Sequence, residues 1–145
     1  MKKIALALGL LGLTVLANAA DPLNGSVWKT IDDKTKQPKA IVKFTEQKNG
    51  TLSASIQKVL TPGEEQACKK CEGPYYNKSL KGLKIVHGLK NVGGTSYEDG
   101  TILDPSSGKT YKLKGELVDG GKTLELRGFI GVSVLGRNQT WIRAN

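Results

Sequence analysis

The clearest structural pattern in the chain is at residues 111–127, YKLKGELVDGGKTLELR. Its first half alternates apolar or small side chains with charged ones: Tyr111, Leu113, Gly115 and Leu117 fall on one side, and Lys112, Lys114 and Glu116 on the other. Alternation with a period of two predicts a β-strand that buries one face. A turn follows at residues 119–122, and Leu124 and Leu126 then resume the alternation. The stretch therefore predicts two antiparallel strands joined by a short turn.

The same alternation extends outward from this hairpin in both directions. Further strands are expected at residues 27–31, 40–45, 52–57, 83–89, 95–103 and 138–143, with an interruption near Asp99-Gly100. Lys48-Asn49-Gly50 predicts a tight two-residue hairpin turn, because Asn-Gly fits the positive φ angles of that turn. Most connections are too short for crossovers, so the strands are expected to be antiparallel. About eight such strands favour a sandwiched or closed sheet, and closure into a barrel removes exposed edges.

The first nineteen residues have the pattern of a secretory signal peptide. A basic start, Met1-Lys2-Lys3, precedes an apolar run over residues 4–16 and a small-residue cleavage motif at Ala17-Asn18-Ala19. The run is shorter than the roughly 20 apolar residues of a transmembrane helix. We therefore expect residues 20–145 to form one exported domain without a transmembrane anchor, in the bacterial periplasm or secreted.

Residues 20–145 keep 20 of the 22 lysines and arginines and all 13 acidic residues, a formal net charge of +7. The basic residues are spread along the chain without a run of five or six, so a nucleic-acid-binding arm is not indicated. An evenly basic surface suits an anionic envelope lipid or glycan as partner. The alternative is that the positive charge only keeps the protein soluble.

Cys68-Lys69-Lys70-Cys71 holds the only two cysteines, inside a long connection over residues 61–82 that has room for one helical turn. In an exported protein this pair should be oxidised. It predicts a disulfide that pins the loop, worth about 2 kcal/mol for so short a ring. The alternative is a thiol–disulfide redox site, although the chain lacks the βαβ pattern around such motifs. A zinc site lacks ligands, since His87 is the only histidine.

No set of residues has the spacing of a catalytic site. His87 has no obvious partner, and the chain has no G-x-S-x-G motif. Gly108-Lys109-Thr110 resembles the end of a phosphate-binding loop, but that motif needs glycine where the chain has Leu103. We therefore expect a binding protein rather than an enzyme, with no metal and no cofactor.

The aromatic residues give candidates for a ligand site and for a structural clasp. An eight-stranded barrel has room for side chains or one small ligand. Candidates for contact with a small apolar or amphiphilic ligand are Phe44, Tyr97, Tyr111 and Leu113. The disulfide-pinned loop is expected to sit over one mouth of the barrel, with its residues Tyr75 and Tyr76 near the entrance. Closure would make the first and last strands neighbours, so that Arg143 could stack on Trp28 or Trp141 as a clasp.

Several motifs together resemble a known family of small exported bacterial proteins, domain of unknown function 2147. The matching residues are Gly25-x-x-Trp28 with Asp32-Asp33, Cys68-x-x-Cys71-x-Gly73, Gly82-Leu83, Asp99-Gly100-x-Ile102-x-Asp104-Pro105-x-x-Gly108-Lys109-x-Tyr111, Leu124-x-Leu126-Arg127-Gly128 and Gly136-Arg137-x-Gln139-x-Trp141-x-Arg143. This resemblance implies a lipocalin-like barrel and a ligand-binding role. The first-strand tryptophan and last-strand arginine also look like the lipocalin clasp, although the Gly-to-Trp spacing is one residue longer than the lipocalin G-x-W.

Overall fold

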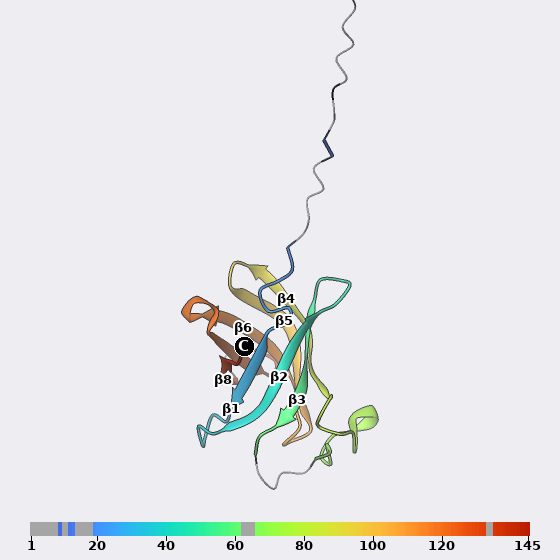
Figure 1. Ribbon diagram of the computed structural model, residues 1–145. Coiled ribbons are helices and arrows are strands. Elements are labelled where there is room, and N and C mark those ends of the chain that lie inside the picture. Colours follow the sequence, from blue (N-terminus) through green and yellow to red (C-terminus); the bar gives the residue numbers. More distant parts are fainter. Residues whose placement is uncertain (1–8, 10–11, 14–18, 62–65, 133–134) are drawn as a thin grey trace, which may run out of the picture.

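The computed structural model describes residues 9, 12–13, 19–61, 66–132 and 135–145. In this part of the chain, eight antiparallel strands form one closed barrel, in which each strand pairs with the next and β8 pairs with β1 (Figure 1). The strands are β1 (Val27–Ile31), β2 (Pro38–Glu46), β3 (Leu52–Val59), β4 (Lys84–Gly93), β5 (Ser96–Asp104), β6 (Lys109–Val118), β7 (Thr123–Phe129) and β8 (Gly136–Arg143). The predicted all-β barrel is confirmed.

Most of the predicted signal peptide lies outside the described residues. Within them, no helix is both long and apolar enough to cross a membrane.

The hairpin of β6 and β7 has the register that its alternation predicts. The pairs run without a shift from Lys112 opposite Phe129 to Val118 opposite Thr123. The turn between them is a short 3-10 element, η2 (Asp119–Gly121). The inward leucines of both strands are buried, whereas Lys112 is exposed.

The turn between β2 and β3 differs from the predicted two-residue type. The Gln47 amide donates to the Thr51 carbonyl (2.7 Å) and the Gly50 amide donates to the Gln47 carbonyl (2.9 Å). Lys48, Asn49 and Gly50 therefore all lie in the loop, and among them Gly50 alone has a positive φ, at 81°. Three-residue loops with one left-handed residue are common hairpin connections. The Asn-Gly pair thus indicated a hairpin correctly, but the predicted loop length was wrong.

The interruption expected in β5 is present. The register against β6 shifts between Tyr97 and Gly100, and Asp99 has a φ of 60°. Gly100 packs directly on Leu89 of β4, since a Cβ at this glycine would lie 2.9 Å from the Leu89 Cδ1. Such an irregularity in the pairing is typical of a β-bulge, here near the start of β5.

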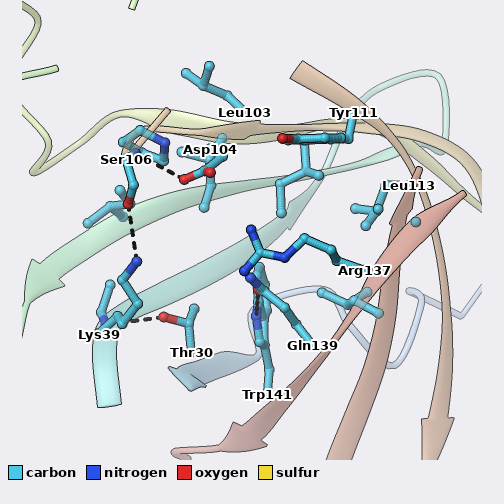
Figure 2. Close-up of a pocket in the computed structure, with 18 of the residues that line it drawn as sticks. Thr30, Lys39, Leu103, Asp104, Ser106, Tyr111, Leu113, Arg137, Gln139 and Trp141 are labelled. Atoms are coloured by element: carbon cyan, nitrogen blue, oxygen red, sulfur yellow. Dashed lines mark hydrogen bonds between the residues drawn. The ribbon is translucent and has the colours of Figure 1, made fainter. Parts of the chain in front are cut away.

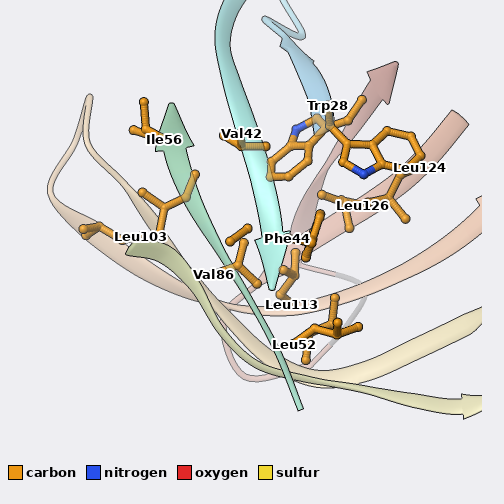
Figure 3. Close-up of a cluster of buried hydrophobic side chains, with 14 of the residues drawn as sticks. Trp28, Val42, Phe44, Leu52, Ile56, Val86, Leu103, Leu113, Leu124 and Leu126 are labelled. Atoms are coloured by element: carbon orange, nitrogen blue, oxygen red, sulfur yellow. The ribbon is translucent and has the colours of Figure 1, made fainter. Parts of the chain in front are cut away.

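The large side chains that are buried most completely lie at one end of the barrel, which we call the closed end. Trp28, Phe44, Leu52, Leu89 and Tyr97 come from five strands and are almost completely buried there. Figure 3 shows Trp28, Phe44 and Leu52 within this cluster of apolar side chains.

The segment before β1 covers the closed end. Leu23 is fully buried, and the Ser26 hydroxyl donates to its carbonyl (2.5 Å) while accepting from the Trp28 indole (2.7 Å). The Tyr97 hydroxyl donates to the Asp21 carboxylate (2.8 Å). Burial raises the pKa of Tyr97, and its bond to Asp21 adds to this shift, so the phenol stays protonated as a donor.

Arg143 fastens β8 to β1 at the same end. Its guanidinium lies 5.3 Å from the centre of the Trp28 ring and donates to the Gly121 carbonyl (2.9 Å). Of the two indoles considered for the clasp, Arg143 therefore stacks on Trp28. Trp141 instead packs against Phe44, with ring centres 6.1 Å apart.

The long connection between β3 and β4 is pinned by the Cys68–Cys71 disulfide and contains a 3-10 turn, η1 (Gly73–Tyr75). The disulfide loop packs on the turn between β5 and β6. At Gly108 the contact is so close that a Cβ would lie 1.9 Å from the Lys70 carbonyl oxygen. Glycine is therefore required at this position to dock the loop on the barrel.

Replacing Gly108 with alanine should destabilise the protein strongly. Its φ of 74° gives alanine a strain of about 1 kcal/mol, and the clash with Lys70 adds about 1–3 kcal/mol. Urea unfolding followed by tryptophan fluorescence measures the loss. Gly50→Ala is the control, because its φ of 81° imposes the same strain while no atom lies within 4 Å of the new Cβ. Equal losses in the two variants would contradict the close docking.

Replacing Ser26 with alanine should lower the free energy of unfolding by about 1–3 kcal/mol, because the buried Trp28 indole N–H loses its acceptor. The same unfolding measurement tests this, with Ser79→Ala as an exposed control. A loss no greater than that of the control would show that the Ser26 hydroxyl does not hold the closed end.

Candidate functional site

A cavity of about 330 Å³ opens at the end of the barrel opposite the N-terminal segment. The connections β1–β2, β3–β4, β5–β6 and β7–β8 surround this open end. The cavity is mainly apolar, with the following apolar lining residues: Ala40, Ile56, Val59, Leu80, Ile85, Ile102, Leu103, Leu113, Leu126, Ile130, Leu135 and Trp141. Its volume lies at the lower end of the range of about 300–1,000 Å³ for small-molecule sites.

Gly128 on β7 helps to leave this space empty. It follows Leu124 and Leu126 on the inward face, where a side chain would otherwise project. A Cβ at Gly128 would meet Tyr111 at 3.5 Å and Ile102 at 3.8 Å, which are ordinary contact distances. An alanine therefore fits here, whereas a longer side chain would extend into the cavity.

Trp141 on β8 separates the cavity from the packed core. Its ring lines the cavity and packs against the fully buried Phe44. The indole N–H donates to Gln139, the next inward residue on β8, at 3.1 Å. Trp141 therefore forms a floor, with a polar amide just above it.

Polar side chains gather where the cavity meets solvent (Figure 2). The Lys39 ammonium donates to the Ser106 hydroxyl (3.1 Å) and lies 3.8 Å from an Asp32 carboxylate oxygen. The Asp104 carboxylate accepts from the Ser106 amide (2.9 Å). These contacts tie the start of β2 to the β5–β6 turn across the mouth.

An ion pair forms a second polar link at the mouth. Arg137, at the start of β8, donates two hydrogen bonds to the Asp33 carboxylate of the β1–β2 connection, at 3.1 and 2.6 Å. These bonds are the main reason why the pKa of Asp33 is lowered and that of Arg137 is raised. Both groups therefore stay charged near neutral pH and hold the β1–β2 connection beside the cavity.

The predicted site residues divide into two groups. Tyr111 and Leu113 line the cavity. Phe44 and Tyr97 lie in the closed-end core, because they point inward from strand ends at which the barrel is filled. Neither Tyr75 nor Tyr76 is part of the lining: the Tyr75 hydroxyl lies 3.4 Å from the His87 imidazole, and Tyr76 is exposed. From the disulfide-pinned loop, it is Leu80 that reaches the cavity.

The sequence interpretation missed the polar groups of the mouth and the role of Gly128. Lys39 and Arg137 carry no distinguishing signal among so many evenly spread basic residues. Gln139 did carry a recognisable signal, since the alternation of the last strand places its amide on the same face as Trp141. A polar residue on an inward face is a usable sign of a cavity that reaches solvent.

The two cysteines form a buried disulfide. Cys68 and Cys71 are only 1% and 3% exposed, and the Cys68 sulfur lies 3.8 Å from the Pro105 carbonyl oxygen. Redox-active cysteines need an accessible sulfur, so this burial favours the role of a staple. Among the described residues, no group of three histidine, cysteine or acidic side chains is placed to hold a metal ion.

Comparison with known proteins places the chain in a family. A solved structure of protein HP1028 from the human pathogen Helicobacter pylori, described as belonging to the lipocalin family, is 26% identical. It matches with a TM-score of 0.73 over 85% of this chain and 83% of that chain. No curated protein matches the chain. The model of the family described as "Uncharacterized protein conserved in bacteria (DUF2147)" matches residues 26–143, and the chain belongs to this family.

Proposed function

We propose that this protein binds a small amphiphilic molecule in the open-end cavity and acts as a carrier or sensor rather than as an enzyme. The observation that carries the proposal is the division of the cavity: aliphatic side chains line its interior, and the polar groups stand at its mouth and above its floor. An apolar body can fill the interior, while Lys39, Ser106 and Gln139 offer hydrogen bonds to a polar end.

The similarity to a protein described as a lipocalin supports binding by the barrel interior. In an eight-stranded barrel the interior is filled by side chains or holds one small ligand. Here Trp28, Phe44 and Tyr97 fill the closed end, and Gly128 leaves the other end open. This distribution favours a ligand of limited size, held above Trp141.

We propose that binding takes place in the bacterial periplasm or outside the cell. Two independent features support this location. The first nineteen residues have the charge, apolar length and cleavage motif of a signal peptide. The Cys68–Cys71 disulfide is of the kind that persists in oxidising compartments and is rare in the cytosol.

A substitution series at Gly128 tests the cavity as the ligand site. Gly128→Leu should weaken uptake of a fluorescent fatty-acid analogue at least tenfold, because its side chain would occupy the space between Tyr111 and Ile102. Gly128→Ala is the matched control and should bind within about twofold of the original protein, since its Cβ makes only ordinary contacts. Fluorescence titration gives both dissociation constants.

Thermal unfolding of each variant shows that the barrel is intact. A folded Gly128→Leu variant that binds the analogue as tightly as the original protein would place the ligand elsewhere and refute the proposal.

A further inference from the structure

The net positive charge of the barrel is concentrated at its open end. The described residues of this half are 31–40, 58–61, 66–85, 104–112, 127–132 and 135–137. They contain thirteen lysines and arginines and four acidic residues, whereas the other described residues from residue 20 onward contain seven of each. The described part of the open half therefore carries a formal charge of +9 and the closed half none; Glu64 and Glu65 lie outside the described residues. The basic residues look evenly spread along the sequence. The uneven distribution appears only in the fold, because the strands alternate in direction and bring every second connection to the same end.

The connection between β7 and β8 adds an apolar tip beside the cavity mouth. Ile130, Val132 and Leu135 are 60%, 60% and 69% exposed. Among the described residues of the barrel and its loops, the other large exposed apolar side chains are Tyr76, Val92 and Ile142. The Leu135 amide donates to the Val132 carbonyl (3.1 Å), so these two exposed residues are held close together. Three aliphatic side chains are thus exposed in one short loop, two of them also lining the cavity.

Basic side chains stand next to this tip on the outer face of β6 and β7. Lys112 pairs directly with Phe129, the last residue of β7, and the Lys114 ammonium lies 5.9 Å from the centre of the Phe129 ring. Lys109 begins the same strand at the open end, on the side of Tyr111 and Leu113 and opposite Asp104 of β5, and it is exposed. The acidic residues of these two strands, Glu116 and Glu125, lie nearer the closed end and pair with each other. The charge on this face therefore changes sign along the barrel.

We infer that the open end docks on the surface of an anionic lipid bilayer, with Ile130, Val132 and Leu135 entering the interface and the lysines lying at the head groups. Exposed aliphatic side chains gain by entering the acyl boundary of a membrane, and nearby lysines add attraction to anionic lipids. A soluble glycan would match the charge but offers no apolar phase for the tip.

This orientation turns the cavity mouth toward the bilayer, from which an amphiphile could enter without crossing water. The docking goes beyond ligand binding and is measured without a ligand, so either proposal can fail while the other stands.

Vesicle co-sedimentation tests the docking with protein recovered from the periplasm of an expressing bacterium, after its mass shows that residues 1–19 are absent. The vesicles contain phosphatidylcholine alone or with one third phosphatidylglycerol. We expect binding to the anionic vesicles, at least tenfold weaker binding to the neutral ones, and further weakening as salt is raised.

Two variants with matched controls locate the surface. Val132→Glu changes the tip without touching the cavity lining, and the double variant Lys109→Glu, Lys112→Glu changes the adjacent charge. Each should weaken binding at least fivefold. One unit of charge near an anionic membrane surface contributes about 1 kcal/mol, and each variant adds negative charge at that surface. Val92→Glu and the double variant Lys43→Glu, Lys48→Glu place the same changes in the closed half and should weaken binding less than twofold.

Three results would overturn the inference. They are equal affinity for neutral and anionic vesicles, equal losses in test and control variants, and Val132→Glu binding as tightly as the original protein. Competition by a soluble anionic polysaccharide, together with insensitivity to Val132→Glu, would assign the basic end to a glycan instead.

Discussion

The pairing of β1 with β8 is the constraint on which the rest of the structure depends, because it turns a sheet with two exposed edges into a barrel with an interior. The seam consists of three residue pairs, from Trp28 opposite Arg143 to Thr30 opposite Trp141. The stack of Arg143 on Trp28 and its bond to Gly121 reinforce so short a seam. Without closure, the inward faces of all eight strands would lose their common core.

Closure alone does not determine whether the interior of the barrel is filled or hollow. The distribution of large and small inward side chains does. Trp28, Phe44 and Tyr97 fill one end, and the segment around Leu23 covers it. At the other end the inward position after Leu126 is a glycine, and Trp141 lies between the two regions. The cavity, its polar mouth and the basic open end therefore share one end of the barrel, so ligand entry and surface contact are properties of the same face.

The sequence predicted the architecture well because each strand buries one face. The alternation of apolar and polar residues within a strand shows which of its residues are buried, without any knowledge of distant contacts. The disulfide and the irregularity at Asp99-Gly100 were also readable from local residue types. The placement of the candidate residues was predicted only in part, since alternation shows that Phe44, Tyr97 and Tyr111 point inward but not at which end of the barrel they lie. The Arg137–Asp33 pair joins residues 104 positions apart, and no local pattern reports such a contact. The concentration of positive charge at the open end was hidden for the same reason. It appears only when the fold brings every second connection between strands to the same end of the barrel.

Native mass spectrometry of the protein, purified from the periplasm without detergent, tests the central claim most directly. We predict that the native mass of the original protein exceeds its denatured mass by about 150–500 Da, the range for one small ligand in a cavity of this size. The folded Gly128→Leu variant, prepared in parallel, should lack this excess. Equal native and denatured masses for the original protein, even after incubation with a mixture of bacterial lipids and fatty acids, would contradict a ligand-binding cavity.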